Sequence, residues 1–189
     1  MALSPRRIAI FCGSTYGARE DYRAAARELG AALAKIQITM IYGGGAIGLM
    51  GDLANSVLAG GGKVIGVMPR EVSDAEVPYD GMTELIRVDT VADRKLMMQS
   101  MADGFIALPG GFGTLDELAA VIAGARVGLH DKPIALLNTI QFFDSFLRHI
   151  DHMIAEKFSK STHTKNLFVD DKPGIILEWM CSCWASNER

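Results

Sequence analysis

The sequence predicts an open α/β fold, in which a doubly wound, mostly parallel sheet carries helices on both of its faces. Two observations support this prediction. Short apolar runs such as Phe105–Leu108 lack the alternation of a half-exposed strand, which indicates strands that are covered on both faces. Segments with a helical spacing of apolar residues separate these runs, and repeated strand–helix units produce parallel strands joined by right-handed crossovers.

The elements of the first half follow from local patterns. Arg7–Phe11 is an apolar run that ends at a turn-rich Cys-Gly-Ser sequence, and the helix after it places Leu29 and Leu33 on one face. Runs of three glycines, Gly43–Gly45 and Gly60–Gly62, end the next strand and the next helix. The elements expected here are strands over 7–11, 38–42, 63–68 and 85–88, and helices over 21–35, 47–59 and 91–102, with a long polar loop over 69–81.

The second half continues this order. An apolar run stops at Pro109, a glycine cluster follows, and the pattern predicts a helix from Thr114. The elements expected are strands over 105–108 and 133–137, and helices over 114–127, 141–157 and 172–184. Because the sequence shows no repeat and no linker, residues 1–189 are expected to form a single Rossmann-like domain.

Composition argues against several classes of protein. Hydrophobic residues make up 49% of the chain, enough for a substantial core. A net charge of -3 without a long basic run gives no support for nucleic-acid binding, and no apolar run approaches the length of a membrane span. The start of the chain is too polar for a secretory signal, and Cys12, Cys181 and Cys183 lack the spacing of a disulfide framework. Cys181-x-Cys183 could bind a metal, but the composition favours two ordinary thiols on a terminal helix. We therefore expect a cytoplasmic protein without a bound metal.

The segment Pro109–Glu117 carries the strongest functional signal. Gly110, Gly111 and Gly113 would let the backbone approach a ligand closely. The first N–H groups of the helix that follows have no partner within that helix, and its dipole favours an anion. A phosphate is the predicted ligand; the alternative is a tight turn before a capped helix. The Gly-Lys-Ser/Thr ending of a triphosphate loop is missing, which favours a monophosphate.

Two more glycine-rich loops end predicted strands, at Gly13-Ser14 and at Gly43–Gly48. The second matches the dinucleotide pattern G-x-G-x-x-G, but the acidic residue expected about 20 residues further on is missing. We therefore expect neither a nicotinamide nor a flavin cofactor. The carboxyl ends of parallel strands meet at one edge of a sheet, so the three loops are expected to line one site.

Charged residues near these loops admit two interpretations. Thr114 and Glu117 have the spacing of a capping box, in which the glutamate folds back on the helix start. The same glutamate would also lie beside the predicted phosphate, as a catalytic carboxylate. Arg94 and Lys95 open a predicted helix, where cations oppose the helix dipole unless an anion is near. They are either solvated surface or ligand-binding groups.

Four segments together resemble a known family. They are Tyr42–Gly51, Arg94-Lys95, Pro109–Glu117 and Gly128–Pro133. They are similar to the LOG ("Lonely guy") family of cytokinin riboside 5′-monophosphate phosphoribohydrolases, often mislabelled as lysine decarboxylases. The resemblance implies a Rossmann-like fold, a homodimer, and hydrolysis of the N-glycosidic bond of a purine nucleoside 5′-monophosphate to a free base and ribose 5-phosphate, without a cofactor.

The resemblance also implies roles for individual residues. Arg94 and Glu117 match the catalytic arginine and glutamate, and Lys95 belongs to the same substrate-binding pair. The residues implied to bind the substrate are Ser14, Gly44, Gly45, Glu76, Lys95, Gly110, Gly111, Gly113 and Thr114. A carboxylate such as that of Glu117 suits the chemistry, because breaking a ribosyl C–N bond develops positive charge on the sugar.

The chain departs from the family pattern at several positions. Val91-Ala92 stands where plant members have Met-His, and Gly124 and Arg126 replace a tryptophan and an amide. These departures predict that AMP or another purine monophosphate is a better substrate than an isoprenylated one. A molybdenum-cofactor carrier with a similar fold is the alternative, but a carrier does not need the Arg94–Glu117 pair. A lysine decarboxylase would need a pyridoxal phosphate lysine, and no lysine has such a context.

Overall fold

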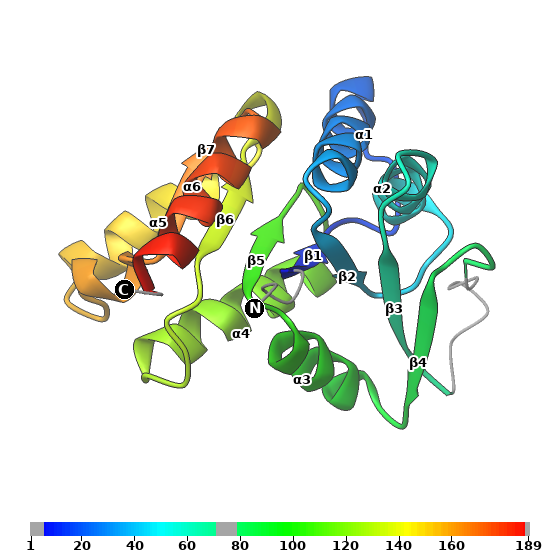
Figure 1. The fold of residues 1–189 in the computed structure, drawn as a ribbon. Coiled ribbons are helices and arrows are strands. Elements are labelled where there is room, and N and C mark those ends of the chain that lie inside the picture. The colour runs from blue at the N-terminus through cyan, green and yellow to red at the C-terminus, as the bar shows by residue number, and fades with distance from the viewer. Residues whose placement is uncertain (1–5, 71–78, 188–189) are drawn as a thin grey trace.

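The computed structural model describes residues 6–70 and 79–187. The strands in this part of the chain are β1 (Arg7–Phe11), β2 (Thr39–Tyr42), β3 (Val64–Pro69), β4 (Glu84–Val88), β5 (Gly104–Ala107), β6 (Ile134–Leu137) and β7 (Leu167–Asp170). They form one sheet in the order β4-β3-β2-β1-β5-β6-β7 (Figure 1). Every neighbouring pair is parallel.

Helices cover both faces of this sheet. They are α1 (Glu20–Lys35), α2 (Gly48–Ala59), α3 (Val91–Met101), α4 (Phe112–Arg126), α5 (Asp144–Ala155) and α6 (Pro173–Asn187), and two short 3-10 turns are η1 (Thr139–Gln141) and η2 (Ser161–Thr164). One hydrophobic cluster joins α1, α2 and α6 to the sheet. A second joins α3, α4 and α5 to its other face. The predicted doubly wound α/β fold is confirmed.

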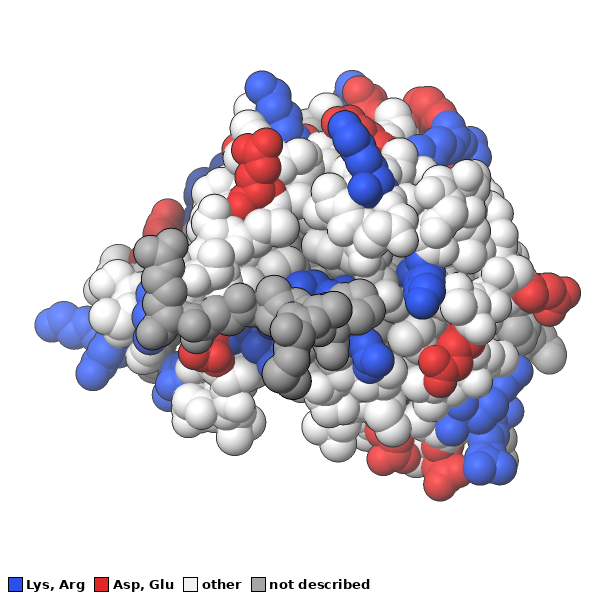
Figure 2. Space-filling model, in the orientation of Figure 1, with Lys and Arg blue, Asp and Glu red and all other residues white. Residues whose placement is uncertain are grey.

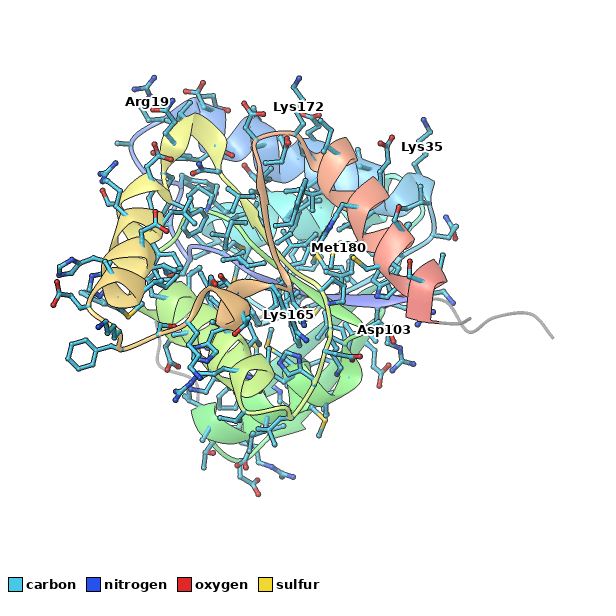
Figure 3. The ribbon with its side chains drawn as sticks, turned by 90° about the vertical axis from the view of Figure 1, so that its left-hand side faces the viewer. Arg19, Lys35, Asp103, Lys165, Lys172 and Met180 are labelled. Carbon is cyan, nitrogen blue, oxygen red and sulfur yellow. The ribbon has the colours of Figure 1, made fainter. Side chains whose placement is uncertain are left out.

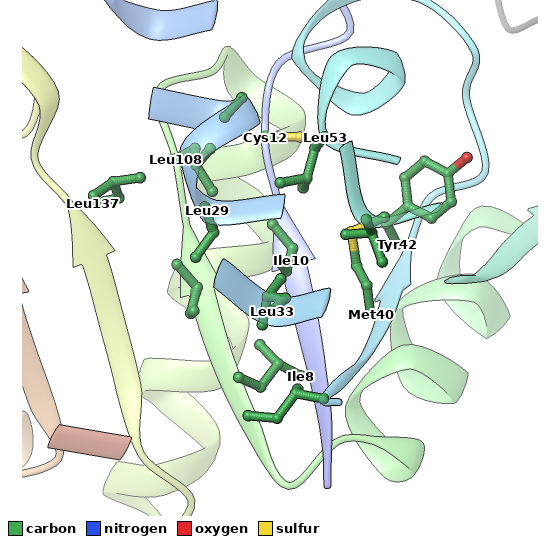
Figure 4. Packing of buried hydrophobic residues seen from close by; sticks show 14 of the residues in the cluster. Ile8, Ile10, Cys12, Leu29, Leu33, Met40, Tyr42, Leu53, Leu108 and Leu137 are labelled. Atoms are coloured by element: carbon green, nitrogen blue, oxygen red, sulfur yellow. The ribbon is translucent and has the colours of Figure 1, made fainter. Parts of the chain in front are cut away.

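Strand β1 shows why the fold has two cores. Successive side chains of a strand point to opposite faces. Ile8 and Ile10 accordingly pack with α1 and α2 in the first cluster, where Leu29 and Leu33 cover them (Figure 4). The alternate residues, Ala9 and Phe11, contribute to the second cluster, in which the Phe11 ring stacks on that of Phe105 in β5, with 6.0 Å between the ring centroids. An apolar strand without alternation is therefore the pattern that a doubly covered sheet requires.

Charged side chains stay at the outer surface. Figure 3 shows Arg19, Lys35 and Lys172 extending away from the body, whereas Met180 of α6 lies between the helix and the sheet, where it is fully buried. On the face drawn in Figure 2, acidic and basic side chains are interspersed. In the described part of the chain, no helix combines the length and the apolar character needed to cross a membrane.

Two features of the second half differ from the sequence-based expectation. Strand β7 was not predicted; it is short, only half-buried, and pairs with β6 through a register that begins at Ile134 and Leu167. The helix expected over 141–157 begins later, at Asp144, after a turn in which Ile140 and Gln141 both have positive φ angles of 46° and 64°. Tertiary pairing and this turn, rather than local periodicity, determine the two features.

The strand order locates a crevice. From β1 the chain proceeds to β2, β3 and β4 on one side, and from β5 to β6 and β7 on the other. Strands β1 and β5 are nevertheless direct neighbours, with Ile8 aligned to Gly104. The connections that leave their carboxyl ends diverge, and such a switch point is where doubly wound sheets bind ligands.

Candidate functional site

A cleft with a volume of about 200 Å³ lies beyond the carboxyl ends of β1 and β5. Six of the residues that the sequence predicted for the site line this cleft: Ser14, Arg94, Gly111, Gly113, Thr114 and Glu117. They come from the loop after β1, from α3, and from the start of α4. The topology thus brings together residues that are about a hundred positions apart in the sequence.

Hydrogen bonds join the loops around the cleft. The Gly13 N–H donates to the Pro109 carbonyl (3.1 Å), which ties the loop after β1 to the glycine loop after β5. The Leu49 N–H donates to the Gly13 carbonyl (3.1 Å), which ties the same loop to the start of α2. Gly48 lies against the Ser14 backbone with a φ of +71°, so a side chain there would be strained and would overlap Ser14. The expectation that the glycine loops share one edge is confirmed.

The start of α4 forms an anion cradle. Its first helical hydrogen bond runs from the Leu115 N–H to the Gly111 carbonyl (3.1 Å). The amides of Phe112, Gly113 and Thr114 precede that bond, so no helical carbonyl is available to them. All three residues line the cleft, where the helix dipole places its positive end. This end of α4 suits a phosphate group.

The capping-box interpretation of Thr114 and Glu117 is wrong. Helix α4 begins at Phe112 rather than at Thr114, its N-cap is Gly111, and no side chain caps it. Thr114 is instead 4% exposed, and its hydroxyl lies against Gly110 so closely that a Cβ on that glycine would overlap it. Glu117 is therefore not used to cap the helix, and its carboxylate belongs to the cleft.

The capped end of α3 places Arg94 opposite Glu117. The Thr90 hydroxyl accepts from the Asp93 N–H (3.0 Å), and the Asp93 carboxylate accepts from the Thr90 N–H (3.0 Å), which is a complete capping box. Arg94 follows directly, and its Nη2 lies 3.8 Å from Oε1 of Glu117. The side chains of this ion pair are only 15% and 12% exposed, so solvent screens their charges little.

Lys95 has a different neighbour from Arg94. Its Nζ donates to both carboxylate oxygens of Asp116, at 2.8 and 3.0 Å. Lys95 is not among the residues that line the cleft. The role in substrate binding that the resemblance implies for Lys95 remains a prediction.

Other predicted residues lie around the cleft rather than along it. Gly44, Gly45 and Gly110 are not part of its lining; Gly110 packs beneath Thr114, while Gly44 and Gly45 lie against methionine side chains. Glu76 lies outside the described residues. Gly13 and Gly43 also line the cleft, as their glycine-rich loops predicted. Four lining residues were not predicted: Ile10, Cys12, Met50 and Phe112. The last three are each adjacent to a glycine of the motifs, and that adjacency is the signal that could have identified them.

Cys12 forms part of the cleft floor as a buried thiol beside Leu53 (Figure 4). Burial, and secondly the negative charge of Glu117, raise the pKa of the Cys12 thiol well above its usual value. A protonated thiol is a poor nucleophile, so Cys12 is suited to packing and not to covalent catalysis. In the described part of the chain, His, Cys, Asp and Glu side chains form no group of three that could hold a metal ion.

Thiol labelling checks this assignment. At pH 8 a disulfide reagent is expected to modify exposed Cys181 first and half-buried Cys183 more slowly, and to modify Cys12 only after unfolding, because Cys12 is buried and protonated. Peptide mapping by mass spectrometry after timed quenching gives the order. Rapid labelling of Cys12 in the folded protein would contradict the assignment.

Comparison with known proteins identifies the family. A family model described as possible lysine decarboxylase matches residues 50–180. Probable cytokinin riboside 5'-monophosphate phosphoribohydrolase LOGL9 of Oryza sativa subsp. japonica is 43% identical over 173 residues, which cover 90% of this chain and 76% of that protein. Cytokinin riboside 5'-monophosphate phosphoribohydrolase LOG2 of Arabidopsis thaliana is also 43% identical, over 83% of this chain and 74% of its own.

The chain belongs to the LOG family. Solved structures share the fold of this LOG protein at lower sequence identity. The molybdenum cofactor carrier protein of Chlamydomonas reinhardtii superposes with a TM-score of 0.71 at 22% identity, covering 96% of this chain and 99% of its own. The molybdenum cofactor binding protein of Rippkaea orientalis gives 0.67 at 20% identity, with the same coverage. These similarities concern the fold alone.

The structure also places the departures of this LOG protein from the family pattern. Gly124 and Arg126 lie at the far end of α4, roughly 18 Å along the helix from its start at about 1.5 Å per residue. A Cβ on Gly124 would lie 3.3 Å from Nε2 of His130, so a histidine occupies the space beside this position. Within one chain neither departure lines the cleft, and an effect on base preference remains a prediction.

Proposed function

We propose that this LOG protein hydrolyses the N-glycosidic bond of a nucleoside 5′-monophosphate, either AMP or a cytokinin riboside monophosphate. The observation that carries the proposal is the Arg94–Glu117 ion pair, which lies in the same cleft as the anion cradle of α4. An arginine and a carboxylate, both largely buried beside a phosphate cradle, suit catalysis on a phosphorylated sugar. The names of the relatives support the same reaction.

In the proposed mechanism, the amides at the start of α4 hold the 5′-phosphate. The C1′–N bond breaks as positive charge develops on the ribose, and the Glu117 carboxylate stabilises that charge or activates the attacking water. The water oxygen bonds to C1′, and its proton passes to the departing base. Arg94 keeps its charge throughout, so its role is to orient Glu117 and contact the ligand. The products are a free base and ribose 5-phosphate.

The size of the cleft supports this placement. A volume of about 200 Å³ is below the roughly 300–1,000 Å³ typical of sites that enclose a small molecule. The cleft therefore suits the phosphate and ribose, with the base at its mouth. Phe112, which is 92% exposed, is one of the lining residues and is available to contact the base.

We further propose a cytoplasmic homodimer. Helices α3 and α4 carry exposed apolar side chains, Val91, Leu96 and Phe112, which are available for contact with a second copy. The three free cysteines are consistent with a reducing compartment. Light scattering after size-exclusion chromatography measures the mass directly, and a monomer at micromolar concentration would contradict the dimer.

A panel of nucleoside monophosphates tests the reaction. The purified protein is incubated with AMP, an isoprenylated adenosine monophosphate, GMP and CMP, and free base is measured by chromatography. Release of adenine or isoprenyladenine with an equal amount of ribose 5-phosphate is the expected result. Tight nucleotide binding without any release of base would instead support a carrier protein.

A further inference from the structure

Two ion pairs side by side connect α3 to α4. The inner pair, Arg94 and Glu117, lies in the cleft at 3.8 Å. The outer pair is formed by Lys95, which follows Arg94 in α3, and Asp116, which precedes Glu117 in α4. Nζ of Lys95 lies 2.8 Å from Oδ2 of Asp116. Neighbouring residues on one helix point in different directions, and neither Lys95 nor Asp116 lines the cleft. The outer pair, which has the shorter contact, therefore lies outside the cleft.

The Lys95 ammonium is engaged by Asp116. An ammonium has three donors, and Lys95 directs two of them to the two oxygens of one carboxylate. The Lys95 side chain is 28% exposed, so its stem is mostly covered by protein. Two of the three donors of Lys95 are therefore directed to Asp116 rather than to the cleft.

Helices α3 and α4 lie on the same face of the sheet, where both contribute to one hydrophobic cluster. Helix α3 packs mainly on β3 and β1, whereas α4 packs on η2, β1 and β5. The two helices thus share a strand beneath them, and the two ion pairs connect their N-terminal halves. The contact between Lys95 and Asp116 is the shorter of the two.

We propose that Lys95 and Asp116 form a clamp that sets the separation of Arg94 and Glu117, so that both are positioning residues for the reaction. The clamp holds the N-terminal halves of α3 and α4 at a fixed distance. Arg94 and Glu117 then remain farther apart than Lys95 and Asp116. At that separation each side chain of the inner pair can turn toward a bound nucleotide. This inference rests on the proposed function, because it assigns Arg94 and Glu117 as the groups that are positioned.

The variant Asp116→Asn distinguishes the clamp from a role of Lys95 in substrate binding. An exposed ion pair contributes little to stability, so the variant is expected to fold. If the clamp positions the inner pair, kcat for AMP falls about tenfold, while KM stays within about twofold. If Lys95 binds substrate instead, its release from Asp116 leaves kcat unchanged or lowers KM, and the clamp is refuted.

An exchange of charges provides the rescue. The double variant Lys95→Asp with Asp116→Lys restores an ion pair of opposite polarity and is expected to recover most of the lost kcat. A double variant that is no better than Asp116→Asn overturns the proposal. The matched control is Asp21→Asn, which removes an exposed pair with Arg19 (3.5 Å) on another helix and is expected to leave kcat unchanged.

Crystal structures of the wild type and Asp116→Asn keep the two proposals distinguishable. The clamp predicts that the Arg94–Glu117 separation changes from 3.8 Å in the variant and returns in the charge exchange. An unchanged separation refutes the clamp, whatever the activity. If the wild type releases no base from any nucleoside monophosphate, the proposed function fails, and the structures alone then decide whether the clamp exists.

Discussion

Replacing Glu117 by glutamine is expected to lower base release from AMP by roughly 10²- to 10⁴-fold, the usual contribution of a positioned acid or base. Glutamine keeps the size of the side chain but removes the charge that would stabilise the sugar cation. The anion cradle is untouched, so AMP is expected to bind nearly as well as before. Steady-state kinetics with chromatographic detection of adenine gives the rate, and a thermal shift with AMP gives the binding.

This substitution also separates catalysis from helix capping. Glutamine serves in a capping box as well as glutamate does, so a loss of activity cannot come from a lost cap. Glu28→Gln, an exposed change on α1 far from the cleft, is the matched control and is expected to retain full activity. Wild-type rates in Glu117→Gln would remove this carboxylate from the mechanism.

Adenosine is expected to be a far poorer substrate than AMP. Phe112, Gly113 and Thr114 line the cleft and precede the first helical hydrogen bond of α4, and hydrogen bonds from such amides to a charged group contribute about 1.5–3 kcal/mol each. Three such bonds at the lower figure amount to on the order of 10³-fold in kcat/KM. Part of this binding energy is used at the scissile bond, so kcat falls together with affinity. Initial rates for the two substrates measure the ratio, and equal rates would refute the assigned phosphate site.

A pair of glycine substitutions tests whether the start of α4 causes the preference for AMP over adenosine. Gly113 and Gly174 are each the second residue of a helix, and a Cβ on either meets nothing within 4 Å. Alanine at both positions should therefore leave the fold intact. Because a Cβ leans toward the helix start, Gly113→Ala is expected to weaken AMP binding roughly 10- to 100-fold, the loss of one hydrogen bond to an anion. Gly174→Ala is expected to bind AMP normally, and similar affinities for both variants would argue against the cradle.

Much of the fold could be predicted because its signals are local. Apolar runs without alternation indicated buried parallel strands, and glycines marked where strands and helices end. Strand β7 could not be predicted in this way, because Leu167–Asp170 is half-buried and pairs with β6, which lies some thirty residues earlier. The start of α4 was placed two residues late, at Thr114 instead of Phe112, because Gly113 resembled part of the turn.

The sequence by itself determined the fold class, the glycine loops, and the residue types of the candidate site, since each depends on patterns within a few neighbouring positions. Only the tertiary structure decided which residues meet. It brought Arg94 to within 3.8 Å of Glu117 and paired Lys95 with Asp116. It also placed Cys12 in the cleft floor and excluded Thr114 as a helix cap. The physical reason is that these contacts depend on the strand order and on how α3 and α4 pack on one face of the sheet, which no local pattern encodes.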